Sequence, residues 1–328
     1  MQNNSNEVTM VVKKTTELSE EEIYQINDLF NKTFQKDQNY LRNKKDFEKK
    51  YLYNFFNFSF HGLMKDRNMI VGCYNIIPYE FTVFSEKKLF GQSVDTAIHP
   101  NYRGNIFNLK RLANAVYKEI KKHNIFFVYG LPNEKFYLVK QKVLGWRDIG
   151  KLEYYIYPNK VKRFFGKFSI FAIFFHILLK VYLKFKPSFD FEYKFPVSKI
   201  YNENFHLGRY SRDHKILSNK KYKCIYKEVI NKNYNNAKIV YILDVLPLEK
   251  KNIEDSVLQL LESIKDVDLI IYISNLKKIP KNLFKIPNFF FKHRQIYVSG
   301  KILDSEKLKE NIFDISNWNI NLSNFDTK

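Results

Sequence analysis

The chain has 328 residues, enough for one large domain or two of ordinary size. Its 45% apolar and 17% aromatic content excludes a disordered chain. The formal net charge of +21 would suit nucleic acid, but only 9 of the 55 basic residues are arginine and the lysines are spread along the chain. We therefore expect no nucleic-acid partner and interpret the charge as suited to polyanionic small substrates.

Cysteine usage and the chain's apolar segments indicate a cytoplasmic protein. Cys73 and Cys224 are far apart and form no CxxC pair, so neither a disulfide framework nor a zinc site is expected. The first residues are polar and lack the apolar core of a leader peptide. The apolar run 168–179 is shorter than the ~20 residues of a membrane span. The lysines around it are compatible with a peripheral membrane contact.

The first half of the chain predicts alternating strands and helices. A strand is expected at 8–16, and Ser19 to Glu22 form a capping box that opens a helix. A basic, aromatic segment at 36–58 predicts a second helix with loops. Four further strands are expected at 58–65, 69–77, 79–84 and 89–99. They are followed by a helix at 105–122, a strand at 125–130, a short helix before Gly145 and a strand at 152–157. This order predicts a mixed, mostly antiparallel sheet with helices on its faces, in the α/β (α+β) class.

The second half repeats a similar pattern. Strands are expected at 222–229, 237–245, 267–274, 289–291 and 296–298, with a helix at 253–265. This order is compatible with an internal structural duplication, although the two halves share too little sequence identity to demonstrate one. We expect a first domain at 1–158, a linker with the apolar helix at 159–190, and a second domain at 191–328.

The most informative segment is 94–109, which predicts a strand, a basic-glycine turn at Arg103-Gly104 and a helix start. A glycine turn that feeds a helix N-terminus gathers unpaired backbone N–H groups at the positive end of the helix dipole. Such a place suits a phosphate group. The alternative is an ordinary surface turn before a helix.

These residues resemble a known family. Tyr102-Arg103-Gly104, the strand that ends in Gly130-Leu131-Pro132-Asn133, and Leu144-Gly145-Trp146 look like the acyl-CoA-binding core of GNAT-superfamily N-acyltransferases. Over the whole chain, scattered polar and aromatic residues resemble the tandem-GNAT sugar N-acyltransferases: Arg209, Tyr210, His214, Tyr222, Asp244, Asn317, Trp318 and Asp326. Those enzymes acylate amino groups of nucleotide-linked deoxysugars for O-antigen or capsule synthesis.

The resemblance implies two GNAT-like domains and an acyl-CoA co-substrate, carrying acetyl or 3-hydroxybutanoyl. Strands 93–99 and 125–131 would separate, and the pantetheine arm would pair with their exposed backbone. Backbone groups near Ile98 would polarise the thioester carbonyl. The implied cofactor-binding residues are Thr96, Ile98, Arg103, Gly104, Asn105, Ile106, Phe107, Asn108 and Asn133. Asn133 could instead cap the next helix.

The chain departs from the family pattern at two positions. Ile106 replaces a small residue of the pyrophosphate loop, which leaves backbone N–H groups as the phosphate donors. Gln141 stands where the family has a tyrosine acid, so Tyr137 is the candidate to replace it, with a packing role or protonation by water as the alternatives.

Two residues are candidates for the general base. Period-two alternation places Asp95 and His99 on one face of their strand. Each has a structural alternative, since Asp95 could satisfy loop amides and His99 could bond locally before Pro100.

The expected substrate is a nucleotide-linked, dTDP-type amino-deoxyhexose between the two domains. Arg209, His214, Trp318 and Asp326 would contact it, unless Trp318 is a core residue and Arg209 a surface ion pair. The predicted reaction is direct attack of the sugar amine on the thioester, without a metal. One alternative is a GNAT-fold transferase for peptide or cell-wall precursors, and another is a non-catalytic basic binding protein.

Overall fold

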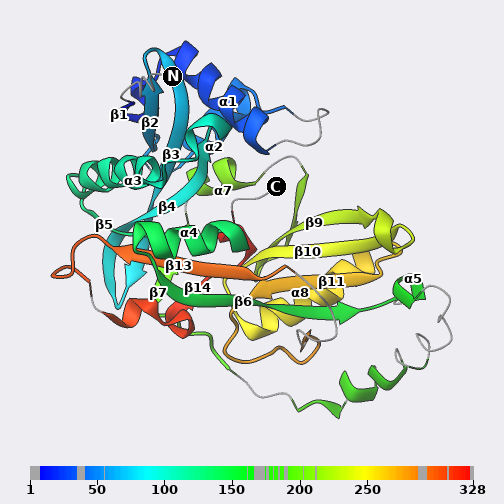
Figure 1. Cartoon of the computed structure of the whole chain (residues 1–328). Helices are drawn as coiled ribbons and strands as arrows, with labels where there is room; N and C mark the ends of the chain where they lie inside the picture. The colour runs from blue at the N-terminus through cyan, green and yellow to red at the C-terminus, as the bar shows by residue number, and fades with distance from the viewer. Residues whose placement is uncertain are drawn as a thin grey trace. The chain divides into compact units, whose positions relative to one another are not determined.

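The computed structural model describes residues 8–34, 41–54, 56–160, 162–165, 191–201, 203–210, 213–286, 294–308 and 310–325, with isolated residues between 174 and 187. It forms two compact units. The first comprises residues 1–150, 196–209 and 297–314, and the second comprises 151–195, 210–296 and 315–328. Each unit therefore draws on separate segments, whereas the sequence patterns suggested contiguous domains. The expected fold class is confirmed, with mostly antiparallel strands flanked by helices (Figure 1).

The sheet of the first unit is antiparallel except at one place. Its strand order is β1 (Thr9–Lys14), β2 (Phe60–Asp66), β3 (Met69–Val83), β4 (Glu86–Ile98), β5 (Ile125–Gly130) and β13 (Ile296–Ile302). β4 and β5 are parallel, and the other neighbours in this order are antiparallel. The short strand β7 (Val197–Lys199) pairs with the end of β3. The parallel pair requires a crossover helix, and α3 (Ile106–Lys121) supplies it.

Helices cover the first unit's sheet on two sides. α1 (Glu20–Phe34) contacts β3, β4 and α2 (Lys44–Tyr51), and α2 contacts α7 (Glu203–Arg209). α3 contacts β1, β2, β3, β5 and α4 (Glu134–Leu144). Figure 1 shows α3 on one side of β2 and β3, with α1 and α2 on the other. The buried face of α3 includes Leu112 and Val116, which pack in one core with Tyr74 and Trp146. Each such aliphatic side chain contributes roughly 1.5–3 kcal/mol of burial free energy.

Local signals in the sequence account for the helix ends. The Ser19 amide donates to Glu22 Oε2 over 2.9 Å and the Glu22 amide donates to Ser19 Oγ over 3.2 Å, which confirms the predicted capping box. α4 ends at Gly145, whose φ of 67° lies in the left-handed region. The Gly-Trp pair therefore has a structural role at a helix end.

The two strands expected at 69–77 and 79–84 are one strand, because β3 continues through Pro78. β2 pairs with β3 only as far as Ile76, and β7 begins to pair at Phe81. Pro78 lies between these two stretches, where its missing N–H costs no ladder hydrogen bond.

The second unit repeats the strand–strand–helix–strand order of the first. β9 (Lys223–Asn231) is antiparallel to β10 (Ala237–Leu246), and α8 (Lys250–Ser263) leads to β11 (Leu269–Ser274), which is parallel to β10. β8 (His214–Ser218) extends the sheet beside β9, and β6 (Arg147–Pro158) pairs with β11. Short elements complete the second unit: α5 (Lys162–Phe165), β12 (Phe284–Lys285) and β14 (Trp318–Asn319). The topology matches β3–β4–α3–β5.

A C-terminal segment occupies the place in the second unit where β10 and β11 stop pairing. Their last pair is Ile242 with Tyr272, after which β10 continues to Leu246. Asn321 then forms a bridge with Ser274, and its Nδ2 donates to Asp244 Oδ1 over 2.9 Å. The separation between these strands is thus filled by the chain itself.

The predicted apolar helix at 168–179 and the strand at 289–291 lie largely outside the described residues. None of the helices in the described part of the chain is long and apolar enough to cross a membrane.

Candidate functional site

The parallel pair β4–β5 opens into a fork. Pairing runs from Leu89–Ile125 to Gln92–Tyr129 and stops there, while β4 continues to Ile98. The backbone of β4 beyond Gln92 therefore faces a widening gap on its β5 side. This is the separation of strands 93–99 and 125–131 that the sequence resemblance implied.

A β-bulge lies in the open part of β4. Cys73 pairs with Ala97 and Asn75 pairs with Val94, so two residues of β4 oppose one of β3. Asp95 in the bulge has a φ of 44°, a strained value for a residue other than glycine. The bulge interrupts the alternation of side chains, so the expectation that Asp95 and His99 share a face by simple period-two spacing does not hold.

Asp95 is the centre of a compact ionic cluster. Its Oδ2 accepts from Arg42 over 2.6 Å, from the Tyr51 hydroxyl over 2.6 Å and from Lys50 over 2.8 Å. Burial raises the pKa of Asp95, but the charges of Lys50 and Arg42 outweigh it and hold the pKa well below its usual range. A carboxylate of such low pKa is a weak base. The structural alternative for Asp95 is therefore favoured.

A second layer of buried polar groups supports this cluster. Asn75 Nδ2 donates to the Asp95 carbonyl over 2.9 Å, and Asn75 Oδ1 lies 2.9 Å from His61 Nδ1. His61 Nε2 lies 2.9 Å from the Thr15 hydroxyl. Burial lowers the pKa of His61 to about 4, so its ring is neutral near pH 7. These residues were not identified from the sequence, because the contacts join segments far apart in the chain.

The turn at the end of β4 offers exposed backbone donors. Gly104, Asn105 and Ile106 are exposed, and their N–H groups make no hydrogen bond within the described part of the chain. The Asn105 side chain caps α3 by accepting from the Phe107 amide over 3.0 Å. The Asn108 amide donates to the Asn105 carbonyl over 3.1 Å. Gly104 has nothing within 4 Å of where a Cβ would stand. The arrangement is an open anion-binding helix start.

Hydrogen bonds join the turn to the neighbouring strands. The Arg103 Nε donates to the Ile98 carbonyl over 2.8 Å, so this side chain folds back along β4. The Tyr102 hydroxyl donates to the carboxylate of Asp66. His99 Nδ1 accepts from the Asn101 amide over 3.4 Å, which is the local bonding considered for it from sequence. Thr96 lies in the bulge, half-buried.

The residues predicted on α4 have structural partners. Asn133 caps the helix by accepting from the Phe136 amide over 2.9 Å, which confirms the capping alternative. The Tyr137 hydroxyl donates to Asp148 over 2.9 Å and its ring stacks on Tyr297 at 4.3 Å. Burial and Asp148 raise the pKa of Tyr137 to about 12, which makes it a weaker proton donor than an ordinary tyrosine.

Lys140 on α4 is a buried cation that sequence reasoning missed. Its Nζ donates to Ser93 Oγ over 3.1 Å and lies 3.8 Å from the ring centroid of Trp146. The signal was available, because Lys140 is four residues from both Phe136 and Leu144 and so shares their helix face.

The residues predicted to bind a sugar nucleotide are divided between the units. Arg209 ends α7 in the first unit, and His214 begins β8 in the second. Both are half-buried. Trp318 is fully buried at 0% exposure, which leaves no face for stacking on a base. Asp326 lies outside the described residues.

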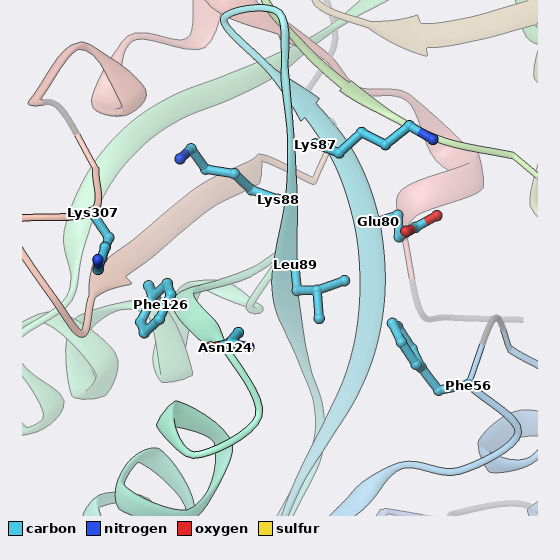
Figure 2. A pocket seen from close by; sticks show the side chains of 8 residues that line it. All are labelled: Phe56, Glu80, Lys87, Lys88, Leu89, Asn124, Phe126 and Lys307. Carbon is cyan, nitrogen blue, oxygen red and sulfur yellow. The ribbon is translucent and has the colours of Figure 1, made fainter.

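A separate pocket of about 370 Å³ lies beside the first residues of the paired part of β4 and β5, away from the fork (Figure 2). Leu89, Asn124 and Phe126 line it together with Lys87, Lys88 and Lys307. It therefore does not belong to the open part of the fork. No group of three or more potential metal ligands occurs among the described residues.

Comparison with known families identifies the first unit. Residues 14–146 match the family model described as an acetyltransferase (GNAT) domain. This segment is therefore similar to a GNAT domain, and the match covers less than half of the chain. The match spans β1's end to Trp146 and so includes the fork, the bulge and the basic-glycine turn.

Solved structures resemble the chain over both units. A GCN5-related N-acetyltransferase from Anabaena variabilis has a TM-score of 0.58 at 13% identity, covering 90% of this chain and 73% of that one. One from Kribbella flavida has a TM-score of 0.58 at 8% identity, covering 91% and 72%. A probable N-acyltransferase from Enterococcus faecalis, of unknown function, has a TM-score of 0.55 at 15% identity, covering 90% and 73%. At these identities the likeness shows the fold alone. No curated protein matches the sequence.

Proposed function

We propose that the first unit binds an acyl-CoA in its β4–β5 fork and transfers the acyl group to an amine. The observation that carries this proposal is the combination of a parallel pair that stops at Gln92–Tyr129 with an open helix start at Gly104. The fork offers strand backbone to an extended pantetheine arm, and the turn offers amides to its pyrophosphate. The GNAT domain match supports the same assignment.

In the proposed reaction the amine nitrogen attacks the thioester carbonyl carbon directly. A C–N bond forms, the C–S bond breaks, the amine loses one proton and the leaving thiolate gains one. Neither cysteine is suited to a covalent intermediate, because burial raises the pKa of both Cys73 and Cys224 to about 12. Since Asp95 and Tyr137 are engaged in pairs, a water molecule is our candidate for carrying the amine proton.

For the acceptor we propose the amino group of a nucleotide-linked, dTDP-type deoxysugar of O-antigen or capsule synthesis. This finer assignment rests on the sequence resemblance and on the chain's net charge of +21, which favours a polyanionic substrate. The half-buried Arg209 and His214 are the candidate contacts.

Thermal stabilisation by a ligand panel tests both levels of this proposal. We expect CoA and acetyl-CoA to raise the melting temperature, and dTDP- or UDP-linked amino sugars to raise it further. A chain that shifts with no CoA compound would refute the acyltransferase assignment. A shift with CoA but with no nucleotide would refute the sugar acceptor and favour peptide or cell-wall precursors.

Gly104→Glu tests the pyrophosphate turn directly. The space around Gly104 is open and its φ is not in the left-handed region, so the fold should tolerate the change. A carboxylate at a helix start that binds phosphate should weaken CoA binding by about tenfold or more. Gly104→Ala is the matched control and should bind nearly as well as the natural chain. Equal affinities of all three by calorimetry would place the pyrophosphate elsewhere.

A further inference from the structure

Lys140 is buried at the closed end of the fork. The residue is 2% exposed, and its ammonium lies among Ser93 Oγ at 3.1 Å, the Trp146 ring at 3.8 Å and the Phe136 ring at 5.6 Å. Lysine is rarely this buried, since removal of an ammonium from water is costly. A cation placed there calls for a reason beyond packing.

Its partners mark the point where the strands part. Ser93 follows Gln92, the last residue of β4 that pairs with β5, and Gly130 is the last residue of β5. A Cβ on Gly130 would lie 2.9 Å from Lys140 Nζ and 3.0 Å from the Ser93 carbonyl oxygen. The backbone of Gly130 therefore lies close to the Lys140 ammonium and to Ser93, at the point where the two strands part.

The surrounding groups hold this end of the fork rigid. Tyr74 and Tyr117 hydroxyls lie 2.8 Å apart, and the Trp146 indole N–H donates to Tyr117 over 2.8 Å. All three side chains are buried. The ring beneath the ammonium is thus held in place by its own hydrogen bond.

We propose that Lys140 and Ser93 form the end wall of the acyl pocket and select acyl chains that bring an oxygen to it. This inference rests on the proposed acyl-CoA site, because the acyl carbons would point from the thioester toward the closed end of the fork. An ammonium and a hydroxyl stabilise a hydroxyl or carboxylate oxygen on the chain. An alkyl chain of equal length would leave them without that contact and would be disfavoured.

The test compares two acyl donors of equal length, 3-hydroxybutanoyl-CoA and butanoyl-CoA, with acetyl-CoA as reference. We expect the natural chain to favour the hydroxyacyl donor in kcat/KM by about tenfold or more. Lys140→Met, close in length but uncharged, should reduce that preference by about tenfold, and Ser93→Ala should reduce it less. Lys142→Met, on the exposed side of α4, is the matched control and should leave the ratio unchanged.

The ratio separates this inference from the proposed function. If no acyl-CoA is bound or used, the acyltransferase proposal itself fails. If acetyl-CoA is used but the natural chain favours butanoyl-CoA, the end-wall inference is overturned without any variant. It is also overturned if Lys140→Met folds, uses acetyl-CoA and keeps the natural ratio. If Lys140→Met does not fold, Ser93→Ala is the deciding variant. The inference is then overturned if Ser93→Ala uses acetyl-CoA and keeps the natural ratio of the two donors.

Discussion

The side chain of Asp95 connects the strained bulge of β4 to α2 and to the segment before α2. Its φ of 44° persists because three donors hold the side chain from α2 and the segment before it. The side chains of Arg42, Lys50 and Asp95 are 12%, 20% and 14% exposed, so the cluster is largely screened from water. The carboxylate is needed to balance two buried cations, which is a structural duty for the residue that the sequence suggested as a base.

Asp95→Asn should therefore destabilise the protein strongly. It preserves size but leaves Arg42 and Lys50 without their anion, and removal of one partner of a buried pair costs about 3–5 kcal/mol. Asp28→Asn is the control, since the Asp28–Lys32 pair is exposed and contributes at most about 1 kcal/mol. Urea unfolding measures both. A loss below about 1 kcal/mol in Asp95→Asn would contradict the structural role.

His61 predicts a pH dependence of stability. Burial lowers its folded pKa to about 4 from 6.5, so between these values the unfolded chain binds more protons than the folded one. The contribution of His61 to the free energy of unfolding is fully present above pH 6.5. It is lost as the pH falls toward 4, by about 3 kcal/mol in total. In His61→Gln this contribution is absent, so the free energy of unfolding should fall less between pH 7 and pH 4, by that amount. Parallel curves from urea unfolding at several pH values would exclude His61 as the cause.

At the scale of elements, each end of α4 is set by one capping residue. Asn133 caps its first turn, and Gly145 ends it in the left-handed conformation. The Asn133 and Gly145 pattern that resembles a cofactor motif thus also has a complete helix-capping explanation.

Asn133→Ala and Asn133→Ser separate these two roles. Serine preserves the cap and should leave stability nearly unchanged, whereas alanine should cost about 1 kcal/mol. If Asn133 acts only as a cap, both variants should bind CoA with the natural affinity once folded. Weaker CoA binding by Asn133→Ser at unchanged stability, measured by calorimetry, would restore the cofactor role.

Elements with local signals were predictable from the sequence, and features made by distant contacts were not. The strand β5 has the predicted limits, and α3 follows the predicted turn, because periodicity and end signals lie within each segment. The bulge at Asp95 and the continuity of β3 through Pro78 depend on neighbouring strands. In the site, the Gly104 turn was recognisable, while the Asp95 cluster and the Lys140–Ser93 contact join segments that only the fold brings together.

At the scale of the whole molecule, the same topology occurs twice with different contents. Both parallel pairs, β4–β5 and β10–β11, stop pairing part-way, and in each pair the strand that continues, β4 or β10, contains a bulge. In the second unit the opening is occupied by the chain, through the Ser274–Asn321 bridge and the Asn321–Asp244 hydrogen bond. The turn from β10 into α8, residues 247–249, also contains no glycine.

These differences predict that one chain binds one CoA. The first fork has an open, basic turn, whereas entry into the second would require displacing Asn321 and leaving the buried Asp244 without that donor, a cost of about 1–3 kcal/mol before any ligand contact. Titration calorimetry with CoA should give a stoichiometry of one, and Gly104→Glu should weaken that single event. Asn321→Ala should leave the stoichiometry at one, because the N-cap residue of α8 is Glu249, whose carboxylate disfavours a phosphate at that helix start. Two binding events in the natural chain would show that the second fork opens, and that the C-terminal segment competes with CoA for it.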